Sequence, residues 1–249
     1  MCLQIFQIPV SEAKLYSTDI SETKRKYYKL MCNGETVFCF SVYKNYYHKR
    51  NTYIQPYFIK KHFDAKSVFL FLKNYFASPL QCMLKNDDTW IPILKSGGFN
   101  LVRRCYEREF TKDDLKSNEI DNVNIEVCTL ENEEYVAACK LLYESYAKNH
   151  EGINPLSVSF DEFATDLPKT VYCIEGGLDN GFVFTEENEI CYVGGNSNVE
   201  VLFVAVLNII FSKYQYVMFE TDDVDSVAMK LKNLFCDVRD DSFDTYIFS

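Results

Sequence analysis

The sequence reads YVMFETDDVDSVAMKLKNLF at residues 216–235 and LQCMLKNDDTWIPILKSGGF at residues 80–99. Each stretch opens with an apolar, strand-like run, continues through an acidic turn suited to cap a helix, and closes with a lysine shortly before a phenylalanine. An apolar, helix-like segment precedes each stretch, at residues 199–211 and 64–76, and an extended segment follows it. This internal similarity predicts that the chain contains one folding pattern twice.

The repeated order of helix, strand, helix and strand, closing on a Gly-Phe corner, resembles the C-terminal half of the GCN5-related N-acetyltransferase (GNAT) family. The first copy has this corner as LKSGGF at residues 94–99, whereas the second reads LKNLF at residues 231–235 and lacks the glycine. The resemblance implies an α+β fold of two tandem GNAT-like lobes, each with a central, mostly antiparallel mixed sheet flanked by helices. It covers most of the chain and concerns the pattern of elements, not identical residues.

The expected elements divide unevenly between the two lobes. Residues 125–249 read as strand, two helices, three strands, long helix, strand, helix and strand, which is the complete order of the family. Residues 1–111 read as a degenerate lobe that is shortened at its front, with strands at 2–9 and 35–43 and partly helical structure within 11–30. Residues 112–124 are charged, lack apolar periodicity, and are predicted to link the two lobes.

Charge is distributed unequally along the chain. Residues 1–110 hold 17 Lys and Arg against 9 Asp and Glu, whereas residues 111–249 hold 9 against 27. Two interpretations stay open: lobes of opposite sign attract each other, or the acidic lobe attracts a cationic acceptor such as an amine. The net charge of −10 and the absence of a nucleic-acid-binding motif argue against nucleic acid as a partner.

The ten cysteines are scattered without a Cys-x-x-Cys pair, and the three histidines are far apart in the sequence. This spacing argues against a zinc finger or ribbon, so no metal site is expected. Most cysteines lie in apolar runs, which favours buried thiols in a reducing cytoplasm. The sequence shows no signal-like start and no apolar run of membrane-spanning length, so a cytoplasmic protein without membrane contact is expected.

The GNAT resemblance implies that acetyl-CoA is the co-substrate. In the family, backbone amides between the fourth strand and the long helix cradle the pyrophosphate. The corresponding residues 193–199 read VGGNSNV, which has small residues but lacks the family's leading Arg or Gln. The positions that the resemblance assigns to the cofactor are Cys191, Val193, Gly194, Gly195, Asn196, Ser197 and Asn198. The equivalent residues 51–63 contain no glycine, so the first lobe is not expected to bind the cofactor in this way.

Acetyl transfer to an amine needs a base for the ammonium and an acid for the leaving thiolate. Glu220 and Glu175, near the ends of two expected strands, are the candidate bases, because a carboxylate beside a cleft can have a raised pKa. In the family, the general acid for the thiolate is often a tyrosine in the helix after the fifth strand, but residues 226–232 contain no tyrosine. Tyr192 is therefore the candidate acid, with Tyr246, Lys230 and Lys232 as further possibilities. A solvated helix face explains the two lysines better than an acid role does.

These observations predict an acyl-CoA-dependent N-acetyltransferase that acts on a small-molecule amine from a site in the C-terminal lobe. The altered loop and the missing tyrosine support an alternative, a catalytically inactive GNAT-like binding or regulatory protein. Cys191 has no histidine near it in the sequence, so a structural thiol is favoured there over a nucleophile.

Overall fold

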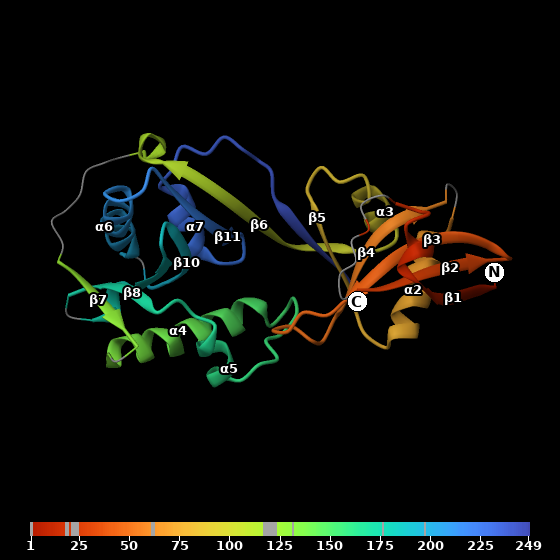
Figure 1. Cartoon of the computed structure of the whole chain (residues 1–249), viewed down its shortest axis with the longest axis horizontal. Helices are drawn as coiled ribbons and strands as arrows, with labels where there is room; N and C mark the ends of the chain where they lie inside the picture. Colours follow the sequence, from red (N-terminus) through yellow and green to blue (C-terminus); the bar gives the residue numbers. More distant parts are fainter. Residues whose placement is uncertain are drawn as a thin grey trace. The chain divides into compact units, whose positions relative to one another are not determined.

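The computed structural model describes residues 2–17, 20, 25–60, 63–116, 124–130, 132–175, 177–196 and 198–249. Strands and helices alternate as expected of an α+β fold (Figure 1). In chain order they are β1 (Leu3–Ile8), α1 (Val10–Ala13), β2 (Lys26–Cys32), β3 (Glu35–Tyr43), β4 (Thr52–Ile59), α2 (Ala65–Phe76), β5 (Leu80–Lys85), α3 (Ile91–Ser96), β6 (Asn100–Thr111), η1 (Lys112–Asp114), β7 (Ile125–Thr129), α4 (Glu133–His150), α5 (Phe160–Thr165), β8 (Thr170–Ile174), η2 (Leu178–Asn180), β9 (Phe182–Glu186), β10 (Glu189–Gly194), α6 (Val199–Phe211), β11 (Tyr216–Asp222), α7 (Ser226–Asn233) and β12 (Phe243–Phe248).

The internal repeat is confirmed and is longer than the sequence pattern indicates. The order of three strands, helix, strand, helix and strand runs from β2 to β6 and again from β8 to β12. Each copy follows a first strand; in the described residues the four-residue α1 comes between in the first half, and α4 and α5 in the second. The front of the first half is therefore shortened in its helices but not in its strands.

The chain forms two compact units, and both are discontinuous in sequence. Unit 1 contains Met1–Val102, Ile153–Ser157 and Asp244–Ser249, and unit 2 contains Arg103–Gly152 and Val158–Phe243. Nearly all of β12 therefore belongs to unit 1, and most of β6 belongs to unit 2. The division into lobes at residues 1–111 and 125–249 stays a prediction, and residues 117–123 of the expected linker lie outside the described part of the chain.

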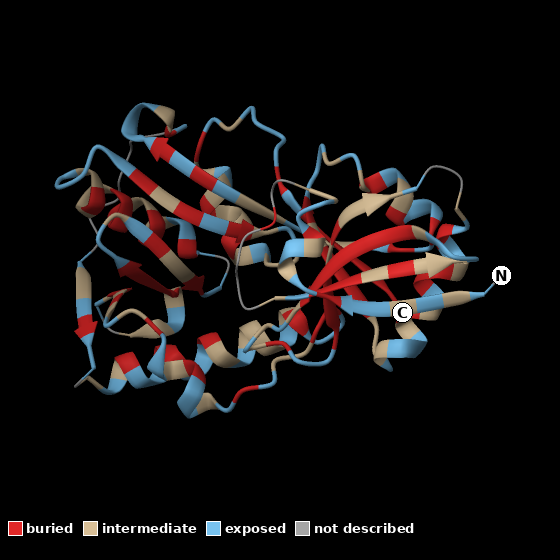
Figure 2. Cartoon of the chain, turned by 45° about the vertical axis from the view of Figure 1, so that its right-hand side comes forward, coloured by how far each residue is buried: buried red, intermediate tan, exposed pale blue. Residues whose placement is uncertain are grey.

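Unit 1 has the strand order β1-β2-β3-β4-β5-β12, and its β4–β5 pair is parallel. A two-residue turn at Asn33 and Gly34 joins β2 to β3, with φ of 50° and 86°. Positive φ at both turn residues is the requirement of a type I′ hairpin. Buried residues follow one another along β3 (Figure 2), and Val68, Phe69 and Leu72 of α2 pack against the same core.

Two strands of unit 1 are absent from the sequence-based prediction. Residues 11–30 read as partly helical, but α1 ends at Ala13 and β2 begins at Lys26. The second missed strand is β4, which is buried on both faces at Tyr53 and Ile54. Tyrosines, lysines and Pro56 obscure the apolar alternation of these strands, and pairing with β3 decides their conformation.

Unit 2 has the strand order β6-β11-β10-β9-β8-β7, and its β10–β11 pair is parallel. Val217 and Phe219 of β11 point into a core that α6 and α7 cover, and α4 and α5 lie on the other face (Figure 1). The long helix α6 is apolar on most of its surface, with seven of its residues buried. This burial explains why an uninterrupted apolar segment of 13 residues forms a core helix.

A buried ion-pair network fixes β6 to the segment after α7. The Arg108 side chain, which is 1% exposed, donates from Nε to Asp237 Oδ2 at 2.5 Å, and the Asp237 side chain is 3% exposed. Lys232 and Arg239 contact the same carboxylate at 3.3 and 2.9 Å. Burial alone raises the pKa of Asp237, but hydrogen bonds from Arg239, Arg108 and Lys232 outweigh this effect and hold it well below its usual range. Lys232 is therefore part of a buried network, and the interpretation of a solvated lysine is wrong at this position.

The expected capped helix at residues 159–166 is confirmed as α5, and its cap gives a testable stability difference. Ser159 Oγ accepts from the Glu162 amide at 3.3 Å, while Glu162 Oε2 accepts from the Ser159 amide at 2.9 Å. We expect Ser159→Ala to lower the free energy of unfolding by about 1 kcal/mol, because the Glu162 amide loses its acceptor. Urea unfolding measures this difference. Ser159→Gly is the control and should cost only a few tenths of a kcal/mol; equal losses for both variants would contradict the capping role.

Candidate active site

The two parallel strands of unit 2 separate after a short ladder. β10 and β11 pair only at Glu189 with Met218 and at Ile190 with Phe219. The register of β10 against β9 shifts between Ile190 and Tyr192, which makes Cys191 a bulge. From Tyr192 onward β10 stays paired to β9 but is no longer paired to β11. The edge of β10 that faces β11 can therefore receive an extended ligand as an added strand.

A cavity of about 450 Å³ lies where β10 ends. Four of the predicted cofactor positions line it, namely Val193, Gly194, Gly195 and Asn196. The N-terminal end of α7 and the C-terminal half of α4 complete its wall, with Leu178, Asp179 and Phe182 beside them. The α4 and α7 residues that line it are Leu141, Ser145, Lys148, Asn149, Asp225, Ser226 and Val227. The structure thus brings the predicted cofactor loop together with two helices that the sequence analysis did not connect with it.

The two glycines of the loop also have a packing function. A Cβ on Gly194 would collide with the Phe182 ring, and a Cβ on Gly195 would lie 2.6 Å from the Gly181 Cα. Gly195 has φ of +148°, a backbone conformation that favours glycine. Close approach of the β9 and β10 backbones therefore requires these glycines, whatever the loop binds.

The loop presents donors that fit an anion. α6 begins at Val199, and the amides of its first turn have no acceptor within the helix. Asn196 Oδ1 accepts from the Asn198 amide at 2.8 Å, which fixes the entry to the helix. Lys230 Nζ of α7 lies 3.5 Å from the Asn196 carbonyl oxygen and places a positive charge beside the loop. Ser197, which the sequence assigns to the same loop, lies outside the described residues.

The corresponding helix of unit 1 differs at its N-terminus. β4 and β5 also pair at only two positions before they separate. At the start of α2, however, the Asp64 carboxylate accepts from the amide and the hydroxyl of Ser67 at 3.2 and 2.5 Å. A carboxylate that already holds these donors disfavours a phosphate there. This difference supports the prediction that the first half does not bind the cofactor in the family's way.

Glu220 is the candidate general base whose surroundings raise the pKa of its carboxylate. It lies on β11 directly opposite Glu107 of β6, and Cys105 Sγ lies 3.8 Å from its Oε2. Partial burial, followed by the charges of Glu107 and Asp222, raises the pKa of Glu220. More than a third of the residue is exposed, so we assign more weight to the like charges than to burial. A carboxylate of raised pKa that stays accessible is suited to accept a proton from an ammonium group.

Tyr192 lies on the α5 side of the sheet. Its ring centroid is 6.4 Å from that of Phe163 in α5. Burial raises the pKa of Tyr192, and the charges of Cys191 and Glu220 raise it further. A phenol that keeps its proton at neutral pH can donate it to a leaving thiolate.

Two other predicted candidates lie away from this arrangement, and Cys191, for which the sequence favours a structural thiol, is unsuited to be a nucleophile. Glu175 follows β8, which is separated from β11 by β9 and β10, and it accepts from Asn124 Nδ2 at 2.8 Å. Tyr246 lies in β12 of unit 1, where its ring is 1% exposed in the hydrophobic core. For Cys191, burial and the charges of Glu189 and Glu186 raise the thiol pKa to about 12, which disfavours a nucleophilic thiolate.

The structure adds a buried polar cluster formed by Asp222, on the same strand as Glu220, Arg103 of β6 and His150 of α4. Arg103 Nη1 donates to Asp222 Oδ2 at 3.0 Å and lies 3.1 Å from His150 Nε2. Because arginine can only donate, His150 Nε2 is the acceptor, and Nδ1 donates to the Tyr146 carbonyl oxygen at 2.9 Å. The histidine and the arginine are 47 residues apart, so no local pattern in the sequence could connect them.

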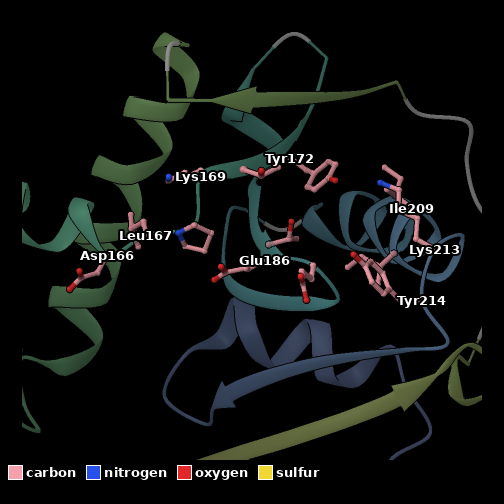
Figure 3. Close-up of a pocket in the computed structure, with 13 residues that line it drawn as sticks. Asp166, Leu167, Lys169, Tyr172, Glu186, Ile209, Lys213 and Tyr214 are labelled. Carbon is pink, nitrogen blue, oxygen red and sulfur yellow. The ribbon is translucent and has the colours of Figure 1, made fainter.

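A larger cavity, of about 620 Å³, lies elsewhere in unit 2 (Figure 3). It is bordered by Asp166, Lys169, Glu186 and Lys213, and it contains none of the predicted site residues. Its wall includes the C-terminal end of α6, where the helix dipole is negative and disfavours an anion. We therefore place the candidate active site at the smaller cavity, where the chemistry of the loop fits a phosphate-containing ligand.

Comparison with known proteins identifies the fold. No family model and no curated protein matches the sequence. A GCN5-related N-acetyltransferase from Sphaerobacter thermophilus is similar in structure, with a TM-score of 0.55, 10% identity, and coverage of 99% of this chain and 95% of that one. One from Kribbella flavida has a TM-score of 0.47, 13% identity, and coverage of 98% and 70%. A tandem GNAT protein from the clavulanic acid biosynthesis pathway has a TM-score of 0.45, 6% identity, and coverage of 99% and 98%.

The chain therefore has the fold of the GCN5-related N-acetyltransferases, and the expected fold class is confirmed. At 10% identity the similarity concerns the fold alone. Among the described residues, no helix combines the length and the apolarity needed to cross a membrane.

Proposed function

We propose that unit 2 binds acetyl-CoA between β10 and β11 and transfers its acetyl group to the amine of a small-molecule acceptor. One observation carries this proposal: the two strands separate after two residue pairs, beside a cavity that the loop at residues 193–196 lines. The free edge of β10 is suited to pair with the pantetheine arm as an added strand. The first turn of α6 and Lys230 are suited to face the pyrophosphate.

The acidic residues around Glu220 support a cationic acceptor. Glu107, Asp222 and Glu189 all act electrostatically on Glu220, and the lobe as a whole is acidic. Such a field attracts an ammonium group and disfavours an anionic acceptor. In this proposal Glu220 accepts the proton of the ammonium, and the neutral amine then attacks the thioester carbonyl carbon. The carbon–nitrogen bond forms and the carbon–sulfur bond breaks, and the Tyr192 hydroxyl donates a proton to the leaving sulfur. The proton that the nitrogen loses as it becomes an amide restores the Tyr192 hydroxyl.

The test is a turnover assay with a panel of small cationic amines. The full chain is incubated with acetyl-CoA and each amine, and the released CoA thiol is measured against hydrolysis without an amine. At least one amine should accelerate thiol release, and the acetylated amine should appear in equal amount. Release that no amine accelerates, in a protein that still binds acetyl-CoA, would support the alternative of a GNAT-like binding or regulatory protein. The absence of a tyrosine in α7 is the observation that favours this alternative.

Lys230 gives a prediction for the binding step. We expect Lys230→Glu to weaken acetyl-CoA binding by roughly tenfold at low salt, because a negative charge replaces a positive one beside the pyrophosphate. The dissociation constant is measured by calorimetry at two salt concentrations, and the difference should shrink at the higher one. Lys140→Glu, on an exposed position of α4 outside the cavity wall, is the matched control and should leave the affinity unchanged. Equal effects of both variants would contradict the placement of the pyrophosphate.

A further inference from the structure

Two buried thiols and a carboxylate meet on the outer strands of unit 2. Cys128 of β7 and Cys173 of β8 are both 0% exposed, and their sulfur atoms are 3.7 Å apart. Glu126 lies directly opposite Cys173 in the register of the two strands. The donor atoms of all three residues lie within 4.8 Å of one another. Strand pairing therefore brings together three potential metal ligands that are up to 47 residues apart in the sequence.

We propose that Glu126, Cys128 and Cys173 bind one thiophilic divalent cation of the Zn²⁺ type. Two zinc–sulfur bonds of about 2.3 Å at a tetrahedral angle place their sulfur atoms about 3.8 Å apart. The two thiols already have this spacing, so the metal requires little rearrangement of them. A carboxylate oxygen is an accepted third ligand of zinc. Among the described residues no fourth Cys, His, Asp or Glu joins the set, which leaves one position for water.

The strand register argues against a disulfide at the same place. Cys128 pairs with Val171, and Cys173 pairs with Glu126, so the two cysteines are diagonal neighbours. Diagonal residues of an antiparallel pair have Cα atoms about 7–8 Å apart, whereas a disulfide needs roughly 4.4–6.8 Å. A metal ion bridges this longer separation without movement of the strands.

Metal binding releases two protons from this site. Zinc binds thiolates, so each of the two cysteines exchanges its S–H bond for a Zn–S bond and releases its proton. Glu126 is partly exposed, which gives the ion an approach from solvent. The bound ion would link the five-residue edge strand β7 to its neighbour β8.

Cadmium titration of the full, reduced and metal-free chain tests the proposal. Cd²⁺ is used as the probe because its bonds to thiolates give an ultraviolet charge-transfer band. We expect the band to saturate at one equivalent and to disappear when a chelator removes the Cd²⁺. The double variant Cys128→Ser/Cys173→Ser should lose the band. Cys139→Ser, which changes another buried thiol in α4, is the matched control and should keep it. An unchanged band in the double variant, or no band in the wild type, would overturn the site.

Two further measurements keep the test decisive if the double variant does not fold. Glu126→Gln leaves both thiols in place and should weaken Cd²⁺ binding by about tenfold or more while the band persists at saturation; an unchanged affinity would remove Glu126 from the proposed ligand set. The chain isolated without reductant and then unfolded should show all ten cysteines as free thiols. A loss of two free thiols that reduction restores, and that the Cys128→Ser variant does not show, would identify a disulfide in place of the metal site.

Discussion

Asp237→Asn is expected to lower the free energy of unfolding of unit 2 by about 3–5 kcal/mol. The substitution leaves the Arg108 guanidinium buried without its charged partner, which is the costly way to break a buried ion pair. It also removes the partner that Lys232 and Arg239 share. The network connects β6, α7 and the segment at residues 236–242, so its loss should increase the unfolding rate of this part of the chain. Denaturant unfolding monitored by circular dichroism measures the effect.

Asp241→Asn is the matched control, because Asp241 approaches the same guanidinium at 3.5 Å but its side chain is 73% exposed. We expect a loss below about 1 kcal/mol for this variant. The difference between wild type and Asp237→Asn should also depend on pH. Since the pKa of Asp237 is lowered in the folded state, its stabilisation is present above the unfolded pKa of about 3.9 and is lost as the pH falls through the folded value. Equal losses for both variants at neutral pH would contradict the buried network.

Glu220→Gln is expected to lower kcat for acetyl transfer by about 10²–10⁴-fold, because the amide cannot accept the proton of the ammonium. Acetyl-CoA binding should stay within about twofold of the wild type, since Glu220 does not line the cavity at the end of β10. Steady-state rates and calorimetry separate the two effects. If acetyl-CoA binding and kcat both fall, Glu220 supports the structure of the site and is not shown to be the base. If kcat is unchanged, Glu220 is not the base.

Glu107→Gln tests the origin of the raised pKa of Glu220. A base acts in its deprotonated form, so the activity rises with pH through the pKa of Glu220 and forms the acidic limb of the pH–activity profile. A raised pKa moves this limb to higher pH. Removing the like charge of Glu107, directly opposite in the strand register, should move the limb to lower pH while activity at higher pH persists. Both proteins are measured with the same acceptor, so the ionisation of the amine cancels. If the limb lies at the same pH in both proteins, Glu220 is not the group whose ionisation sets it.

The second half of the fold could be predicted from local patterns. The segment at residues 199–211 is apolar on nearly all sides, and Asp225 caps α7 through the amides of Val227 and Ala228. Both signals lie within a few residues and do not depend on distant partners. Strands β2 and β4 could not be predicted in the same way, because both of their faces are covered and their tyrosines do not alternate with polar residues.

The cofactor loop could be predicted from its small residues, but the remainder of the cavity could not. Lys148 and Asn149 reach it from α4, more than 40 residues earlier in the chain than the loop. The Arg108–Asp237 pair joins residues 129 positions apart, and the last residues of the chain, Asp244–Ser249, belong to unit 1 with Met1–Val102. Such contacts are set by the packing of whole elements, which no short stretch of sequence specifies.

Calorimetric titration of the full chain with acetyl-CoA tests the central claim most directly. The account predicts one site per chain with a dissociation constant in the micromolar range, and loss of the heat in Ser226→Trp. Ser226 is an exposed residue of the cavity wall, so the larger side chain fills the cavity without disturbing the core. No heat with millimolar acetyl-CoA, or full binding to Ser226→Trp, would contradict a cofactor site at the end of β10.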